Sequence, residues 1–258
     1  MISNQQRSLA TQRQEQPANG PGLWNGTLYL ARRELRRTWR SHIWALVMAP
    51  LMGAAAAFMV SEDFQLSPVA LNTIFILLIA ALPRTSAWRS GERGSAGWTI
   101  SSNSHLSFLR SLPLTARQIA AARALVSVAS VLALCAAFFA PLYALSEALR
   151  EGLGVKGCLL FAAFWVGYAL AFEAIGLFTE LGLFGKVGFW AYLVLIWFAA
   201  GAIAGSTGQQ EVSAVEAVSE LIRSYGALPA LAALAAGCGA LALSWLATSW
   251  RLRKKESR

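Results

Sequence analysis

The sequence predicts an all-α membrane protein with six transmembrane helices, both termini in the cytoplasm, and an amphipathic interfacial helix before the first span. Hydrophobic residues make up 56% of the 258 residues and charged residues only 14%, against about 25% charged in an average soluble domain. One water-soluble core cannot bury so much apolar surface. The apolar residues also fall into long runs separated by polar connections, as membrane-spanning helices require.

The N-terminal region divides into a polar tail and a basic helix. Residues 1–22 are rich in Gln, Asn, Ser and Arg, which predicts a disordered cytoplasmic tail. Residues 23–42 are the predicted interfacial helix, since apolar side chains recur there at helical spacing: Leu28, Ala31, Leu35 and Trp39. Arginines crowd its other faces: Arg32, Arg33, Arg36, Arg37 and Arg40. Such a helix lies on anionic headgroups, either as a plain orientation anchor or as a site for a regulatory lipid.

The transmembrane domain is predicted to cover residues 43–250. Its six spans are expected at residues 43–60, 68–83, 124–145, 157–178, 187–205 and 227–250. Each apolar run crosses all or most of a hydrocarbon core of about 30 Å at a rise of about 1.5 Å per residue. Residues 211–225, between the last two spans, have the pattern of a short amphipathic helix on the outer leaflet. A basic cytoplasmic tail, residues 251–258, ends the chain.

Positive charge sets the expected orientation, because Lys and Arg beside short loops stay on the cytoplasmic side. With both termini inside, only Arg150, Lys156 and Arg223 of the 22 Lys and Arg residues face outward. The protein is therefore expected to be a multi-pass protein of the inner (plasma) membrane, with the lipid bilayer as a partner. Nucleic acid is not expected as a partner, since the basic residues flank spans and lack an aromatic platform for stacking bases.

Motifs for catalysis and nucleotide binding are absent from the sequence. The string nearest to a phosphate-binding loop, Gly182–Val187, has the wrong spacing and no hydroxyl group after its lysine. The histidines, His42 and His105, are expected at a headgroup position and in the cytoplasmic loop, where they cannot complete a protease or metal site. The cysteines lack metal-ligand spacing. The chain is therefore expected not to be an enzyme, and to hold no cofactor or metal of its own.

Glu173 is the acid inside a predicted span and the candidate intramembrane polar site. An ionised carboxylate at the bilayer centre costs at least about 2.5 kcal/mol, so its side chain is expected to face protein or water. Two interpretations stay open, a contact for substrate or proton coupling and a hydrogen bond to a neighbouring helix. Gly201 and Gly205 form a GxxxG pattern, which permits close helix packing within one chain or between two copies.

The string SFLRSLPLTARQI, residues 107–119, is expected to enter the third span from the cytoplasm and resembles permease subunits of type-two ABC exporters. The similarity extends over most of the chain after residue 22, including Arg-Glu-Leu-Arg-Arg at residues 33–37. It implies a permease that works with ABC ATPase subunits, which bind ATP and magnesium, and with a second permease copy or paralogue. The cargo classes that it implies include drugs, peptides, lipids and lipid-linked glycans. The absence of a charged cavity within the spans favours an amphipathic or lipid-like cargo.

In that family the loop between spans two and three holds a coupling helix that docks on the ATPase. The equivalent loop here is residues 84–117, where Gly91–Gly94 resembles part of the family's acidic stretch. The resemblance carries over only Glu92 and Arg93 as coupling residues. A protein without an ATP site can be driven only if a partner moves a rigid cytoplasmic element joined to its spans.

Two other functions stay open. A membrane-embedded enzyme acting on lipids would use Glu173 or His105 as its base, and it needs a second polar group beside one of them. A non-transporting membrane anchor or immunity protein would hold a soluble partner without moving any cargo.

Overall fold

The structure is a computed structural model, and it describes residues 23–60, 76, 115–178, 194 and 213–256. Five helices and no strand lie in this part of the chain. They are α2 (Leu23–Val60), α5 (Ala116–Leu145), α6 (Glu147–Phe178), α8 (Ala214–Tyr225) and α9 (Leu228–Glu256). The predicted all-α class is confirmed for the described residues.

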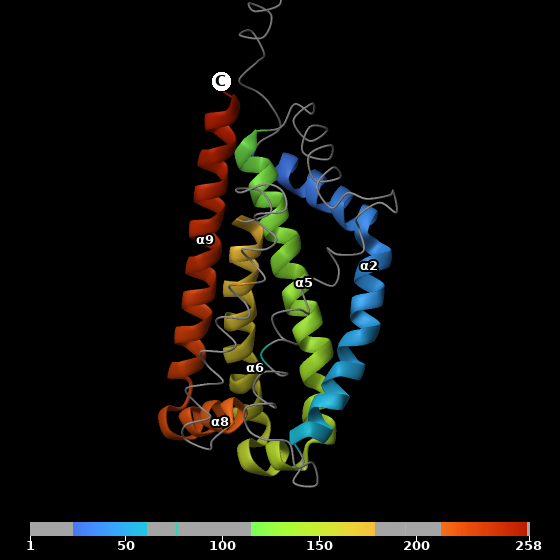
Figure 1. Cartoon of the computed structure of the whole chain (residues 1–258), viewed down its shortest axis with the longest axis vertical. Coiled ribbons are helices and arrows are strands. Elements are labelled where there is room, and N and C mark those ends of the chain that lie inside the picture. Colours follow the sequence, from blue (N-terminus) through green and yellow to red (C-terminus); the bar gives the residue numbers. More distant parts are fainter. Residues whose placement is uncertain (1–22, 61–75, 77–114, 179–193, 195–212, 257–258) are drawn as a thin grey trace, which may run out of the picture.

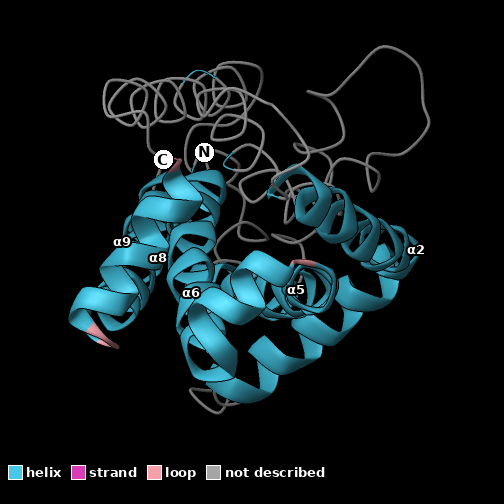
Figure 2. Cartoon of the chain, turned by 90° about the horizontal axis from the view of Figure 1, so that it is seen from below, coloured by secondary structure: helices cyan, strands magenta, loops and turns pink. Residues whose placement is uncertain are grey.

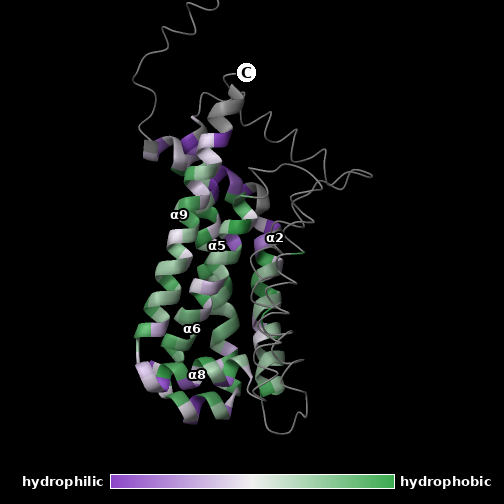
Figure 3. Cartoon of the chain, turned by 60° about the vertical axis from the view of Figure 1, so that its left-hand side comes forward, coloured by the Kyte–Doolittle hydropathy of each residue, from purple (hydrophilic) through white to green (hydrophobic). Residues whose placement is uncertain are grey.

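Four of the helices are long and apolar enough to cross a membrane. These segments are His42–Val60, Arg117–Leu145, Glu147–Phe178 and Leu228–Arg251. Figure 3 shows their apolar residues along the middle of the bundle and polar residues gathered at its two ends. They correspond to the first, third, fourth and sixth predicted spans. Apart from Ile76 and Val194, the second and fifth predicted spans lie outside the described residues, as does the tail 1–22.

All four long helices run beyond the spans predicted for them, and α9 continues past residue 250 to Glu256, into the predicted basic tail. Residues 23–42 and the first span form one continuous helix, α2, whose dark blue N-terminal half crosses obliquely over one end of the bundle (Figure 1). α5 begins at Ala116 rather than at residue 124 because Thr115 and Gln118 form a capping box, in which each side chain bonds the other residue's backbone N–H. α6 begins at Glu147 and passes a kink at Gly154, whose φ of 63° favours glycine.

The long helices form two parallel pairs. α2 and α5 run side by side in one direction, since Leu30 packs with Ile119 near one end and Gly53 lies against Phe138 further along. α6 and α9 run together in the opposite direction, and α5 meets α6 between the pairs. Figure 2 shows the resulting order, with α9 and α2 on the two sides and α6 and α5 between them.

The α6–α9 pair is held by a glycine contact. A Cβ atom at Gly167 would overlap the backbone of Ala233, and one at Gly237 would overlap the carbonyl oxygen of Gly167. Ser244 of α9 also donates to the carbonyl oxygen of Ala174 at 2.7 Å. Helices in lipid associate through close packing, which small residues allow. The GxxxG pattern at residues 201–205 lies outside the described residues.

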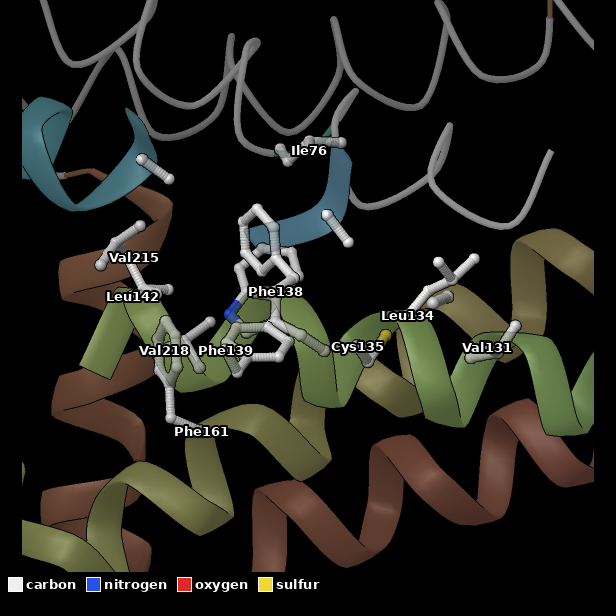
Figure 4. Close-up of a cluster of buried hydrophobic side chains, with 14 of the residues drawn as sticks. Ile76, Val131, Leu134, Cys135, Phe138, Phe139, Leu142, Phe161, Val215 and Val218 are labelled. Carbon is white, nitrogen blue, oxygen red and sulfur yellow. The ribbon is translucent and has the colours of Figure 1, made fainter. Parts of the chain in front are cut away.

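The core between the two ends is apolar and aromatic (Figure 4). Contacting rings on α5 and α6 have centroids between 4.7 and 6.2 Å apart, and the pair that joins the two helices is Phe139 with Phe161. Ile76, from the predicted second span, is fully buried beside Phe138. The cysteines, Cys135, Cys158 and Cys238, are all free thiols.

α8 is the amphipathic helix predicted between the last two spans. A capping box between Ser213 and Glu216 starts it. It lies across one end of the bundle, and its buried face, with Val215, Val218 and Ile222, packs on protein. Leu221 and Tyr225 of the same helix are exposed.

The two ends of the bundle differ in charge. One end, called the basic end below, holds the starts of α2 and α5 and the ends of α6 and α9. Its described arginines with placed side chains are Arg32, Arg33, Arg36, Arg40, Arg117, Arg123 and Arg251. The opposite end, called the α8 end, holds Arg150, Lys156 and Arg223 together with Glu147, Glu151, Glu216 and Glu220. This separation agrees with the charge distribution predicted for the two sides of the membrane.

The glycine contact predicts a position-specific loss of stability. Gly237→Leu is expected to lower the free energy of unfolding by about 1–3 kcal/mol, because the new side chain has to push α6 and α9 apart. Gly239→Leu on the same helix is the control, since a Cβ atom there meets nothing within 4 Å. Unfolding midpoints of the two variants in one detergent measure the difference. Equal midpoints would contradict the contact.

Candidate functional site

Buried polar side chains lie towards the two ends of the bundle. At the basic end they are Thr27, Glu34, Gln118, Ser244, Thr248 and Ser249, and at the α8 end they are Ser146, Ser213 and Ser219. The serines of the α8 end bond within their own helix or cap. Between helices, the α8 end has the bond from Arg223 Nε of α8 to the carbonyl oxygen of Gly152 in α6, at 3.1 Å. At the basic end polar contacts connect all four long helices, which makes this end the candidate site.

The first turns of α5 make a polar contact with each of the other three long helices. In chain order, the Arg117 carbonyl oxygen accepts from Trp245 Nε1 of α9 at 3.4 Å, Arg123 Nη1 lies 3.8 Å from Glu34 Oε2 of α2, and Ser127 Oγ donates to Glu173 Oε1 of α6 at 2.9 Å. We call these three contacts the α5 polar links. They fall within about three helical turns. α5 begins just before these residues, at the capping box of Thr115.

The link to α2 is a buried ion pair. The Glu34 side chain is 6% exposed and that of Arg123 is 22% exposed. Around the pair, Leu30 and Ala31 of α2 pack with Ile119 and Ala122 of α5. A charge in such surroundings is strongly destabilising unless it is paired, so the contact fixes how α2 lies on α5.

Glu34 was not among the predicted site residues. It is the acid in a helix crowded with arginines, and it lies three and seven residues after Ala31 and Thr27, which are also buried. That spacing places it on the helix face that packs against protein. A single acid on a helix face that also carries buried residues is the sequence pattern that could have identified Glu34.

The link to α6 agrees with the hydrogen-bond interpretation of Glu173. The partner is Ser127 of the neighbouring helix, 46 residues away in the chain. Glu173 lies five residues before Phe178, the last residue of α6, and thus towards the basic end rather than at the centre of the helix. At that depth a carboxylate is less costly than at the bilayer centre.

The Ser127–Glu173 pair also supplies the second polar group that the enzyme hypothesis requires. A serine nucleophile needs, besides a base, backbone N–H donors that stabilise an oxyanion. Ser127 and Glu173 both lie inside long α-helices, where backbone N–H groups are bonded within the helix. The pair therefore connects two helices but lacks the surroundings that acyl transfer uses.

The remaining predicted site residues are not brought into this cluster. Glu92, Arg93, His105 and the string Gly182–Val187 lie outside the described residues. His42 begins the first membrane-spanning segment of α2. Within the described ranges, no three His, Cys, Asp and Glu side chains are placed to hold a metal ion.

The fold and the site define the class of protein, a helical membrane protein whose long helices are linked at one charged end. Comparison of the chain with protein-family models, curated proteins and solved structures finds no match. The function therefore has to be argued from the arrangement of the helices and from the chemistry of the α5 polar links.

The buried ion pair predicts energetic coupling between α2 and α5. Glu34→Gln and Arg123→Gln, made singly and together, are expected to be non-additive, with a coupling energy of about 1–3 kcal/mol in a double-mutant cycle on unfolding. The matched control is Glu220 with Arg223, which also lie 3.8 Å apart but are 68% and 53% exposed. Solvent screens that pair, so its coupling is expected below about 0.5 kcal/mol. Equal coupling in the two pairs would contradict a buried link.

The Ser127–Glu173 bond predicts different results for two substitutions. Ser127→Ala removes the donor and is expected to destabilise the protein by about 0.6 kcal/mol, and at most by about 1.7 kcal/mol. Glu173→Gln keeps an oxygen that accepts from Ser127, so the unfolding midpoint is expected to stay near that of the wild type. Ser130→Ala, one turn further along α5, is the control for removing a hydroxyl group. A large loss of stability in Glu173→Gln would show that the negative charge itself holds the helices together.

Proposed function

We propose that the chain is the membrane-spanning permease subunit of an ABC exporter, driven by separate ATPase subunits that bind ATP and magnesium. The observation that carries the proposal is the set of α5 polar links. The predicted coupling loop, residues 84–117, leads directly into the first turns of α5, and those turns bond to α2, α6 and α9. A displacement applied to the loop by a partner would therefore reach every described long helix.

The directions of the helices support six spans. α2 ends at the α8 end and α5 begins at the basic end, as a span at residues 68–83 would require. α6 ends at the basic end and α8 begins at the opposite end, as a span at residues 187–205 would require. Six spans leave both termini on the side of the basic end.

The charges support a cytoplasmic position for that end. The described arginines outnumber the acids there, whereas the α8 end carries both signs. Exposed tryptophans surround the same end: Trp24, Trp39, Trp44 and Trp250. Arginine on the cytoplasmic side and tryptophan at the headgroups are typical of proteins of the inner (plasma) membrane.

The packing supports movement of the helix pairs as units. α6 and α9 are in backbone contact at Gly167 and Gly237, and α2 is in backbone contact with α5 at Gly53. The two pairs meet over a smaller surface, mainly through α5 and α6. Closure of the ATPase subunits would rock one pair against the other and open a pathway beside a second permease, identical or paralogous. The apolar and aromatic middle of the bundle suits an amphipathic or lipid-like cargo.

One observation favours a second candidate function, a membrane-embedded enzyme acting on lipids. Ser127 donates to Glu173, as a nucleophile would to a base. Under this alternative Glu173→Gln abolishes activity while the protein stays folded. In the permease, the same variant is expected to retain coupled ATPase activity and transport, because the amide keeps the contact between α5 and α6.

The export proposal predicts a partner held by the coupling loop. Tagged full-length protein, purified in mild detergent, is expected to bring down an ATP-hydrolysing subunit, and deletion of residues 90–97 around Glu92 and Arg93 is expected to release it. An equally long deletion from the tail, residues 8–15, is the control and is expected to keep the subunit bound. A chain that purifies alone and free of ATPase activity in several mild detergents would overturn the proposal and favour the enzyme.

A further inference from the structure

The N-terminal half of α2 presents three different faces. One face is buried against the start of α5: Thr27, Leu30, Ala31 and Glu34. A second face beside it is apolar yet exposed: Trp24, Leu28, Leu35 and Trp39. The third face, away from the protein, carries arginines at intervals of four residues: Arg32, Arg36 and Arg40. A helix that only packed on protein would need the first of these faces alone.

No acid of the described helices neutralises the arginine face. The acid of this half-helix, Glu34, points to the opposite side and pairs with Arg123. Within the described part of the chain, Arg32, Arg36 and Arg40 have no ion pair, and the contact recorded for Arg40 is the ring of Trp39 at 5.6 Å. Successive arginines at this spacing lie about 6 Å apart along one stripe. An aligned row of uncompensated guanidinium groups is a surface for anions.

The exposed apolar face indicates that the anions bound by the arginines are lipid headgroups. Four large exposed side chains beside the arginines would be costly in water, yet they suit the boundary between headgroups and acyl chains. The same helix continues without interruption into the membrane-spanning segment that begins at His42. The arginines are thereby held at headgroup depth, and a guanidinium group binds phosphate oxygens with two parallel hydrogen bonds.

We propose that the N-terminal half of α2 is a binding surface for anionic phospholipids, whose phosphate groups bind to Arg32, Arg36 and Arg40 while the strip from Trp24 to Trp39 lies among the acyl chains. The lipid holds one side of the helix and Glu34 holds the other side to Arg123. Anionic lipid therefore stabilises the contact of α2 with α5. The inference needs only a membrane-embedded protein, and it does not depend on export.

The test uses the full chain in phosphatidylcholine vesicles with or without phosphatidylglycerol, with the unfolding midpoint as the readout. Phosphatidylglycerol is expected to raise the midpoint of the wild type. A variant with Arg32→Gln, Arg36→Gln and Arg40→Gln is expected to lose most of this rise. The charge-matched control, with Arg150→Gln, Lys156→Gln and Arg223→Gln at the α8 end, is expected to keep it. Because each variant is compared with itself in phosphatidylcholine, a change in basal stability does not affect the result.

Two further measurements separate the bilayer from other sources of phosphate and from acyl-chain effects. Inorganic phosphate added to phosphatidylcholine vesicles is expected to leave the midpoint unchanged, since it cannot engage the apolar strip. High salt is expected to reduce the effect of phosphatidylglycerol on the wild type, because exposed charges are screened. A lipid-dependent rise that persists in the Arg32, Arg36 and Arg40 variant, or that free phosphate reproduces, would overturn the proposal.

Discussion

Polar groups inside a membrane have to find partners within the protein, and among the described helices the first turns of α5 meet such partners on three other helices. A charged side chain and a hydroxyl group on α5, Arg123 and Ser127, reach carboxylates on two different helices, and the Arg117 carbonyl reaches a third helix. The ion pair lies in apolar surroundings, so separation of α2 from α5 would take the buried Glu34 carboxylate away from Arg123. The arrangement of the basic end depends on this requirement.

The rest of the bundle is held by a different kind of force. Along the middle of the helices there is no water to expel, so packing density decides which helices stay together. Glycines at positions 53, 167 and 237 bring backbones into contact and define two tight parallel pairs. The α5 polar links connect these pairs at one end. Aromatic rings such as Phe139 and Phe161 pack between α5 and α6, where the pairs meet. Two tightly packed helix pairs that are linked at the basic end are suited to transmit a movement applied at that end.

The basic end also concentrates the surfaces at which other molecules would act. The loop of residues 84–117, which we propose to meet an ATPase, joins α5 beside the Glu34–Arg123 pair. The other side of the same half of α2 carries the proposed lipid surface. If both proposals hold, Glu34 lies between the partner protein and the membrane. Such an arrangement would let the lipid environment influence how tightly the first helix follows α5.

The sequence by itself determined the all-α class, the four long apolar helices and the separation of charge between the two ends, because hydropathy and charge are properties of short segments. The capping boxes at Thr115 and Ser213 are also local patterns, but they were not predicted, and the third span was expected to begin only at residue 124. Only the tertiary structure decided that Glu173 meets Ser127, that Glu34 meets Arg123, and that Gly167 meets Gly237. These partners lie far apart in the chain and on different helices. Which faces come together depends on helix rotation and direction, and neither is encoded in the composition of any one segment.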